Sequence, residues 1–316
     1  MNTVFFSHPA CRQHDMGEGH PECPARLDAI TDHLRATGLD VALDFREAPE
    51  AHADDLERAH AAAYVLGVTD LLRQVQASGE ARHLDPDTVA SPQTLSAALR
   101  AAGAAVAATD EVIRGPARRA FCAVRPPGHH ATRDEAMGFC FFNNVAVAAR
   151  HALDVHGLSR VAIVDFDVHH GNGTEDIIAG DERVLMCGVF EIGLYPFNSD
   201  EARSLRDAPN MVNVGLPKRS GSEAFRAAVN DHWLPALEAF RPELIVVSAG
   251  FDAHRDDDMG NLGLVDADYE WVTRQLMRVA ERHSRGRVVS CLEGGYVLAP
   301  LARCVATHVK VLIGAD

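Results

Sequence analysis

Short apolar runs alternate along the chain with longer segments whose apolar residues recur at a helical spacing. The runs are rich in Val, Ile and Leu and are almost continuous in apolarity, which is typical of parallel strands covered on both faces. They predict strands at Phe121–Arg125, Val161–Asp165, Val184–Val189, Leu244–Ser248 and Val288–Leu292.

The segments between these runs predict helices. Ser91 followed by Pro92 is typical of an N-cap and a first-turn proline, so a helix is expected from there to about Ile113. Further helices are expected at Asn144–His156, Ser222–Phe240, Asp266–His283 and Leu298–Ile313, and loops at Gly215–Ser222 and His254–Gly263. Without a repeat or a long linker, this alternation predicts one three-layer α/β domain over residues 1–316, with a mostly parallel central sheet.

Charge and composition narrow the class of protein. The net charge of −15 is unfavourable for a nucleic-acid partner and suits a cationic substrate, although it also serves solubility. No apolar run is long enough for a membrane span, and the first residues lack the pattern of a secretory signal. We therefore expect a cytoplasmic protein with reduced cysteines, and the sequence leaves homo-oligomerisation open.

Unusual polar clusters follow the predicted strands. RPPGHH, DFDVHHGNGT, SAGFDAHRDD and EGGY each come at the end of an apolar run. Ligands of open α/β sheets bind beyond the carboxyl ends of the strands, so these clusters are expected to share one site.

Two of these clusters contain candidate metal ligands. Asp167 and His169 are two positions apart in extended chain and therefore point to the same side, and Asp252 follows another strand. Two carboxylates and one imidazole suit zinc, and three protein ligands leave a position open for water and substrate. Asp165 is either a further ligand or the partner that orients a neighbouring histidine. His170 points the other way and is expected to be structural.

The other clusters supply candidates for proton transfer and oxyanion binding. His129 and His130 follow a rigid Pro-Pro-Gly turn, and an imidazole accepts and returns a proton near neutral pH. Tyr296 follows two glycines, and its phenol can donate a hydrogen bond to an oxyanion. Taken alone, each residue also fits a non-catalytic role: the histidines as a surface pair, and the tyrosine as a packing residue.

Together the motifs resemble those of the histone deacetylase superfamily, including its bacterial members and the acetylpolyamine amidohydrolases. The matching strings are GHPECPARL at Gly19–Leu27, RPPGHHA at Arg125–Ala131, GFCFFNN at Gly138–Asn144, DFDVHHGNGT at Asp165–Thr174, SAGFDAH at Ser248–His254 and LEGGY at Leu292–Tyr296. The resemblance implies an arginase-like α/β fold and zinc-dependent removal of acetyl or other acyl groups from lysine side chains.

The resemblance also implies a role for each site residue. Asp167, His169 and Asp252 would bind one zinc ion. His130 would act as general base and acid, and His129, hydrogen-bonded to Asp165, would tune the electrostatics beside it. Tyr296 would bind the substrate carbonyl together with zinc.

Further implied roles concern the surroundings of the zinc. Asn172 stands where some relatives carry Asp, as in the class II branch, so His130 should be less basic than with a carboxylate partner. Gly138, Phe139 and Tyr195 would line a narrow acyl-lysine channel, and Arg26 would lie deeper, near the route of the released acid. Potassium is expected on main-chain oxygens around Asp165, Asp167 and His169.

One region departs from the family pattern. Relatives often have Ser and His or Gln in the segment that reads Gly188-Val189-Phe190-Glu191 here, so a potassium side-chain ligand is expected to be missing. The loop Phe190–Asp200, at the expected mouth, is short. Substrate choice therefore stays open between an acyl-lysine protein or peptide and an acetylated polyamine.

Three alternatives remain. An arginase-type ureohydrolase would recruit His129, Asp165 and Asp252 to a second metal, but further carboxylates for it are not evident. A catalytically silent acyl-lysine binder would keep the pocket without cleavage. A structural zinc cluster at the N-terminus does not match a familiar spacing, and ordinary loop residues are expected at His8, Cys11, His14, His20 and Cys23.

Overall fold

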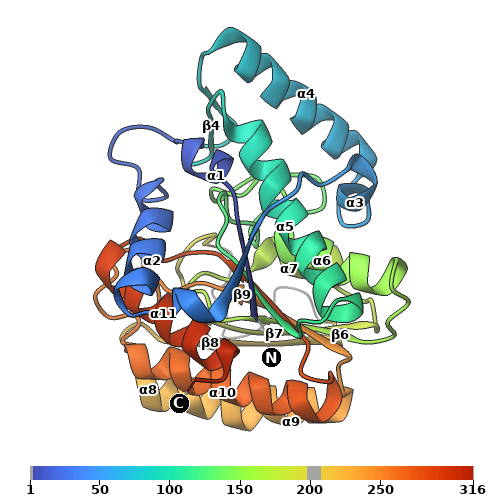
Figure 1. Ribbon diagram of the computed structural model, residues 1–316, viewed down its shortest axis with the longest axis vertical. Helices are drawn as coiled ribbons and strands as arrows, with labels where there is room; N and C mark the ends of the chain where they lie inside the picture. Colours follow the sequence, from blue (N-terminus) through green and yellow to red (C-terminus); the bar gives the residue numbers. More distant parts are fainter. Residues whose placement is uncertain (1–2, 198–207, 316) are drawn as a thin grey trace.

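The computed structural model describes residues 3–197 and 208–315. Its centre is a parallel eight-stranded sheet with the order β2-β1-β5-β10-β9-β6-β7-β8 (Figure 1). The strands are β1 (Thr3–Ser7), β2 (Leu43–Glu47), β5 (Arg119–Cys122), β6 (Val161–Asp165), β7 (Val184–Glu191), β8 (Met211–Leu216), β9 (Leu244–Ala249) and β10 (Val288–Leu292). The remaining strands, β3 (Arg82–His83) and β4 (Val89–Ala90), form a small antiparallel pair.

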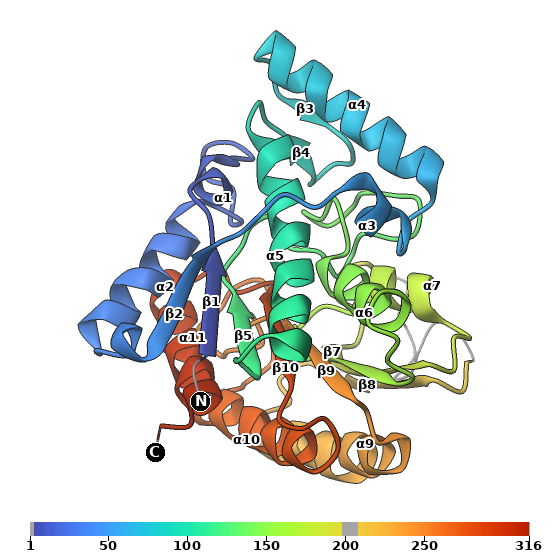
Figure 2. The same ribbon diagram turned by 45° about the vertical axis from the view of Figure 1, so that its right-hand side comes forward.

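Helices cover both faces of the sheet and complete the predicted three-layer α/β fold. The helices α5 (Thr94–Arg114) and α6 (Asn144–Asp154) pack on one face, and α10 (Asp266–His283) and α11 (Leu298–Ile313) pack on the other (Figures 1 and 2). The remaining helices are α1 (Ala10–Gln13), α2 (Ala25–Ala36), η1 (Asp40–Ala42), α3 (Ala53–Glu57), α4 (Ala62–Ser78), α7 (Asn172–Ile178), α8 (Ser222–Ala228), η2 (Val229–Trp233) and α9 (Leu234–Phe240).

The central strands confirm the apolar pattern. Every residue of β6, β7, β9 and β10 is buried, because helices cover both faces of the sheet. The predicted strand Phe121–Arg125 was displaced, since β5 begins at Arg119 and ends at Cys122. Arg119 and Ala120 pair with β1 and β10, whereas Arg125 turns away and places its guanidinium on the carboxylate of Glu22.

The pattern did not reveal three strands of the sheet. β1 was missed because its apolar run is only three residues long, and β2 was missed because it is partly exposed along its whole length. β8 was missed because Asn213 and Gly215 interrupt its apolar run. The predicted loop at Gly215–Ser222 was wrong at both ends, because Gly215 and Leu216 belong to β8 and Ser222 opens α8.

The long helices follow their predicted limits closely. α10 and α11 begin and end at the predicted residues, and the predicted helix Ser222–Phe240 is present as α8 and α9 joined by the π-helical turn η2. The predicted start of α5 was wrong: Ser91 lies in the turn before the helix, where its N–H donates to Thr94 Oγ1 at 2.8 Å. α6 ends at Asp154, two residues before His156. Within residues 3–197 and 208–315, no helix is both long and apolar enough to cross a membrane.

Candidate active site

Three predicted metal ligands meet at the carboxyl ends of β6 and β9. His169 Nδ1 lies 3.0 Å from Asp167 Oδ1 and 3.2 Å from Asp252 Oδ2. All three side chains are buried, and each offers one ligand atom within 4.8 Å of the others. Adjacent parallel strands bring Asp167 and Asp252 together across a separation of 85 positions in sequence.

The surroundings of these three residues fit a bound cation. Asp252 Oδ1 accepts the N–H of Val168 at 3.0 Å, whereas the buried Oδ2 makes no hydrogen bond among the described residues and has His169 Nδ1 at 3.2 Å. Two carboxylates buried side by side are costly unless positive charge faces them. A Cβ on Gly294 would collide with Asp252 Oδ2 and would lie 2.6 Å from Asp167 Oδ2, so glycine is required beside the paired carboxylates. The donor set of two carboxylates and one imidazole suits zinc.

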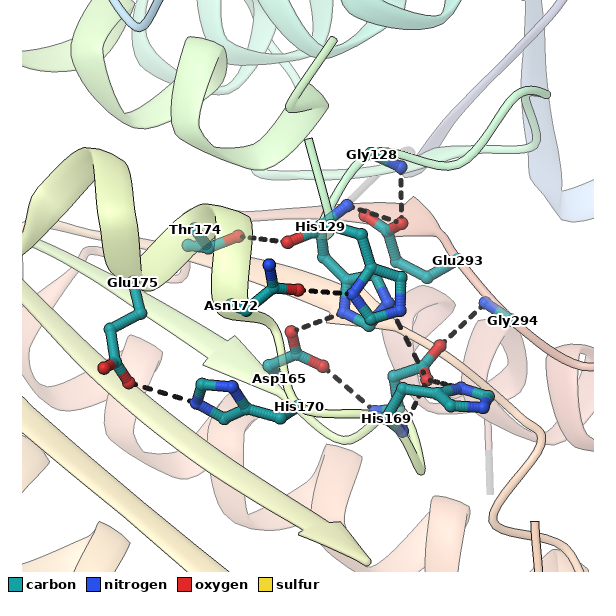
Figure 3. A network of polar contacts seen from close by, with 12 residues as sticks. Gly128, His129, Asp165, His169, His170, Asn172, Thr174, Glu175, Glu293 and Gly294 are labelled. Carbon is teal, nitrogen blue, oxygen red and sulfur yellow. Dashed lines mark hydrogen bonds and ion pairs between the residues drawn. The ribbon is translucent and has the colours of Figure 1, made fainter. Parts of the chain in front are cut away.

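The two adjacent histidines have different partners, Asp165 and Asn172, which are labelled with His129 in Figure 3. His129 Nδ1 donates to Asp165 Oδ2 at 3.0 Å, and His130 Nδ1 donates to Asn172 Oδ1 at 2.7 Å. Because the amide oxygen of Asn172 accepts, Nε2 of His130 is left with a lone pair. Of the two roles left open for Asp165, the structure favours the one that orients a histidine.

Electrostatics separate the two imidazoles. Burial acts to lower the pKa of His129, but the carboxylates of Asp167 and Asp165 outweigh it and raise that pKa well above its usual value. Burial, reinforced by the charges of His129 and His169, lowers the pKa of His130 well below its usual value. His130 is therefore the imidazole that stays neutral and keeps a proton-accepting nitrogen.

A cavity of about 320 Å³ opens over this cluster. Its walls combine the predicted site residues with apolar side chains. They comprise Pro21, Asp87, His130, Gly138, Phe139, His169, Leu194, Tyr195, Phe197, Met259 and Tyr296. The mostly apolar lining suits a thin aliphatic stem that ends in a polar group.

Gly138 and Phe139 are fixed by backbone conformation and by close packing. Both have positive φ, 56° at Gly138 and 70° at Phe139. A Cβ on Gly138 would lie 2.6 Å from His130 Cδ2 and 2.8 Å from Tyr195 Cε1. The glycine therefore lets the channel wall approach the histidine, and Phe139 packs edge-on against Tyr296 with ring centroids 5.9 Å apart.

Arg26 lies behind Tyr296 and is fully buried. Its guanidinium carbon is 4.9 Å from the centre of the Tyr296 ring, and its Nε donates to the carbonyl of Gly295 at 2.6 Å. Glu22 binds both Arg26 and Arg125, so burial of three charges is offset by pairing. This position matches the expectation that Arg26 lies deeper than the channel.

Sequence reasoning missed two carboxylates that hold the site loops. Glu293 Oε2 accepts the N–H groups of Gly128 at 2.7 Å and His129 at 3.1 Å (Figure 3). Asp257 Oδ2 accepts the N–H groups of Tyr296 at 2.6 Å and Val297 at 3.0 Å. Glu293 stands inside the LEGGY string and Asp257 inside an acidic loop, so the available signal was an acidic residue beside a candidate catalytic one.

The remaining predicted residues lie outside the cluster. His170 points away from it and pairs with Glu175 at 3.0 Å, in agreement with a structural role. Gly188 belongs to the segment that departs from the family pattern. A Cβ on Gly188 would lie 2.6 Å from Asn213 Oδ1, so the Asn213 side chain occupies the space that a side chain at position 188 would need. The N-terminal histidines and cysteines form no metal-type group among the described residues. Residues 198–200 of the predicted short mouth loop lie outside the described part of the chain.

Comparisons with known proteins identify the family of the chain. The profile of the histone deacetylase domain matches residues 20–312. A histone deacetylase-like amidohydrolase of Pseudomonas aeruginosa is 38% identical over 99% of this chain and 86% of its own. Histone deacetylase 14, chloroplastic, of Arabidopsis thaliana is 37% identical over 99% of this chain and 77% of its own.

Two further comparisons concern length and fold. Type-2 histone deacetylase 2 of Dictyostelium discoideum is 35% identical over 98% of this chain, which spans 21% of that protein. The crystal structure of the HDA15 HD domain superposes with a TM-score of 0.90 and 31% identity, covering 100% of this chain and 89% of that one. The chain belongs to the histone deacetylase family.

Proposed function

We propose that the chain is a zinc-dependent deacylase that hydrolyses the amide of an acyl-lysine side chain. The observation that carries this proposal is the placement of the His130 imidazole and the Tyr296 phenol with His169 on one mostly apolar cavity, while Asp167 and Asp252 are grouped with His169. Asp167, His169 and Asp252 would hold the zinc ion. When bound, zinc polarises the acyl carbonyl and lowers the pKa of the attacking water.

The protein's own groups then move the protons. His130 accepts a proton from the attacking water at Nε2 and returns it to the departing amine. His129, fixed by Asp165, adds positive charge beside the developing oxyanion. Burial and the nearby carboxylates of Asp252 and Asp167 raise the pKa of Tyr296 well above its usual value, so its phenol stays protonated and donates to that oxyanion.

The cavity supports the substrate class. Phe139, Leu194 and Met259 give it apolar walls that suit the methylene stem of lysine or of a polyamine. Asp87 also lines it, and a carboxylate there suits the cationic end of a polyamine or the basic flank of a peptide. We propose acyl-lysine proteins or peptides as substrates, with acetylated polyamines as the alternative. The potassium ion, the cytoplasmic location, the single domain and any homo-oligomer remain predictions.

A release assay tests the proposal. Acetyl-lysine peptides, acetylputrescine and longer acyl-lysines are incubated with the purified chain, and acetate or acyl acid is quantified. Turnover should be lost after chelation and return on addition of Zn²⁺. Acid release that survives complete metal removal, or no release from any acyl amine by the zinc-loaded chain, would overturn the proposal. Urea formation from guanidino substrates would instead favour the ureohydrolase alternative.

A further inference from the structure

A second group of metal-type ligands lies among α3, α5 and α6, which are side by side in Figure 2. Oδ1 of Asp110, on α5, lies 2.8 Å from Nε2 of His151 on α6 and 2.6 Å from Nε2 of His156 just after α6. The proposed reaction uses none of these three residues. The group therefore needs an account separate from the catalytic one.

The end of α6 creates this arrangement. The helix stops at Asp154, and the backbone N–H of His156 returns to the carbonyl of His151 at 3.4 Å. Two imidazoles five positions apart thus face the same carboxylate, with ring centroids 5.2 Å apart and planes at 75°. His151 is only 5% exposed, whereas the Asp110 side chain is 48% exposed, so water can reach the group from one side.

The other nitrogen of His151 points to a metal rather than to a simple hydrogen-bonded cluster. Nδ1 is buried and has no hydrogen-bond partner among the described residues, and Asp55 Oδ1 lies 3.7 Å from it. In metal centres the ligating nitrogen gives its lone pair to the ion, and the second nitrogen donates its proton to a carboxylate. An ion on Nε2 would place the proton on Nδ1, opposite Asp55.

The local charge is compatible with a cation. The carboxylates of Asp55 and Asp110 flank the imidazoles and favour a cation there. The positive charge of Arg114, one helical turn after Asp110, partly offsets this effect. Burial lowers the pKa of His156 against the opposing effect of Asp110, and Arg114 adds to the lowering. A neutral imidazole keeps the lone pair that a metal requires.

We propose that Asp110, His151 and His156 form a second, non-catalytic site for a divalent ion of the zinc class, with Asp55 as the hydrogen-bond partner of His151. Two imidazoles and one carboxylate suit Zn²⁺, and the exposed side of Asp110 leaves room for water as a fourth ligand. The competing explanation is a polar clamp that joins α3, α5 and α6 without any ion.

Metal counting separates the two explanations. The chelator-treated chain is dialysed against Zn²⁺, and bound zinc is measured by atomic spectrometry. We expect two ions per wild-type chain, and one in the double variant Asp110→Asn, His156→Gln, with unchanged turnover. Asp252→Asn should also bind one, and the triple variant none. A double variant that keeps the wild-type count would overturn the inference.

The same counts keep this inference apart from the proposed function. A single ion that is lost in Asp252→Asn but kept in the double variant would refute the second site alone. A single ion with the opposite pattern would support the second site and refute the catalytic assignment.

A more conservative variant, Asp55→Asn, tests the site without replacing a proposed ligand. Asp55 Oδ2 accepts the N–H of His52 at 3.1 Å, so Asp55→Asn keeps an acceptor at the start of α3 while removing the charge beside His151. Loss of such a partner weakens metal binding by roughly 10-fold or more. In the Asp252→Asn background, Zn²⁺ should raise the melting temperature. Adding Asp55→Asn should increase, by that factor, the Zn²⁺ concentration that gives half of this rise. No melting shift with Zn²⁺ in that background would contradict the site.

Discussion

Tyr296 stands in the cavity wall with His130 and His169, and its ring is held between Phe139 and Arg26. Replacing it with Phe keeps the ring contacts and removes only the hydroxyl. We expect turnover of an acetyl-lysine peptide to fall by roughly 100-fold or more, because one preformed oxyanion donor is lost.

Tyr195→Phe is the matched control, since Tyr195 also lines the cavity and packs edge-on against His130 with ring centroids 4.9 Å apart. Its turnover should fall much less. Comparable losses in the two variants, or near-normal turnover in Tyr296→Phe, would remove Tyr296 from its assigned role.

At the scale of single residues, the sequence was informative wherever chemistry requires a particular side chain. The grouping of Asp167, His169 and Asp252 could be predicted because ligand type and strand-end position agree. Glu293 and Asp257 were not found, because a carboxylate that binds backbone N–H groups leaves no distinctive spacing. The choice between roles for Asp165 also required coordinates, since both fit a residue two positions before Asp167.

Where β10 ends, its loop passes close to the carboxylates that follow β6 and β9. Gly294 donates its N–H to Asp167 Oδ2 at 2.8 Å, and a side chain there would meet both Asp167 and Asp252. Gly294→Ala should therefore reduce zinc affinity by at least about 10-fold, as judged from disturbed metal surroundings elsewhere.

Gly67→Ala is the control for that substitution. Gly67 lies within α4, and a Cβ there meets nothing within 4 Å. It should leave zinc affinity unchanged and stabilise the helix by up to about 1 kcal/mol. Zinc affinity is measured by competition with a chromogenic chelator. Equal affinities for the two variants would show that the loop after β10 moves to accommodate a side chain at position 294.

Three elements meet at His308. This buried residue of α11 shares hydrogen bonds with Thr273 of α10 at 2.7 Å and with Ser290 of β10 at 2.9 Å. Burial lowers the pKa of His308 to about 3. A folded-state pKa below the unfolded value of about 6.5 means that the unfolded chain binds more protons between these pH values. The contribution to stability is therefore full above about pH 6.5 and is lost as the pH falls toward 3.

His308→Gln removes this titration. Chemical denaturation from pH 7 to pH 4 should show a free energy of unfolding that falls less steeply in the variant, by up to about 1.4 kcal/mol per pH unit. His83→Gln, at an exposed position, should keep the wild-type slope. Parallel curves for His308→Gln and the wild type would mean that His308 is not held neutral.

At the scale of elements, prediction succeeded where the apolar pattern is clear. β6, β10, α10 and α11 have their predicted limits, because their apolar patterns begin and end sharply. The strands β1, β2 and β8 could not be predicted in the same way. β1 is largely buried but its apolar run is only three residues long, β2 is partly exposed, and polar residues and a glycine interrupt β8. The start of α5 was missed because Ser91 joins a turn that precedes the helix.

The whole molecule carries a formal net charge of −15. Such a surface should speed the approach of cationic substrates by an effect that salt screens. We expect kcat/KM for a lysine-rich acetyl peptide to fall several-fold as ionic strength rises from about 0.01 M to about 0.15 M, over which the screening length falls from about 30 Å to about 8 Å. A peptide with neutral flanking residues should show little change. Equal salt dependence for both peptides would mean that the charge serves solubility alone.

The order of strands in the sheet was beyond the reach of sequence patterns. Alternating strands and helices predict a parallel sheet, but apolar runs do not state their neighbours. β5 is paired with β1 on one side and β10 on the other, although β10 follows it by more than 160 residues. Only the strand-end position of the motifs indicated that distant segments meet.

This late insertion of β10 has a consequence for biosynthesis. Until residues 288–292 leave the ribosome, β5 and β9 lack the strand that joins them, and the nascent sheet is divided into two halves. The first half holds the histidine pair, whereas the second half holds all three proposed metal ligands after the paired strands β6 and β9. The proposed ligands can therefore meet before β10 is made, but the histidine pair and Tyr296 join them only in the final stage of synthesis.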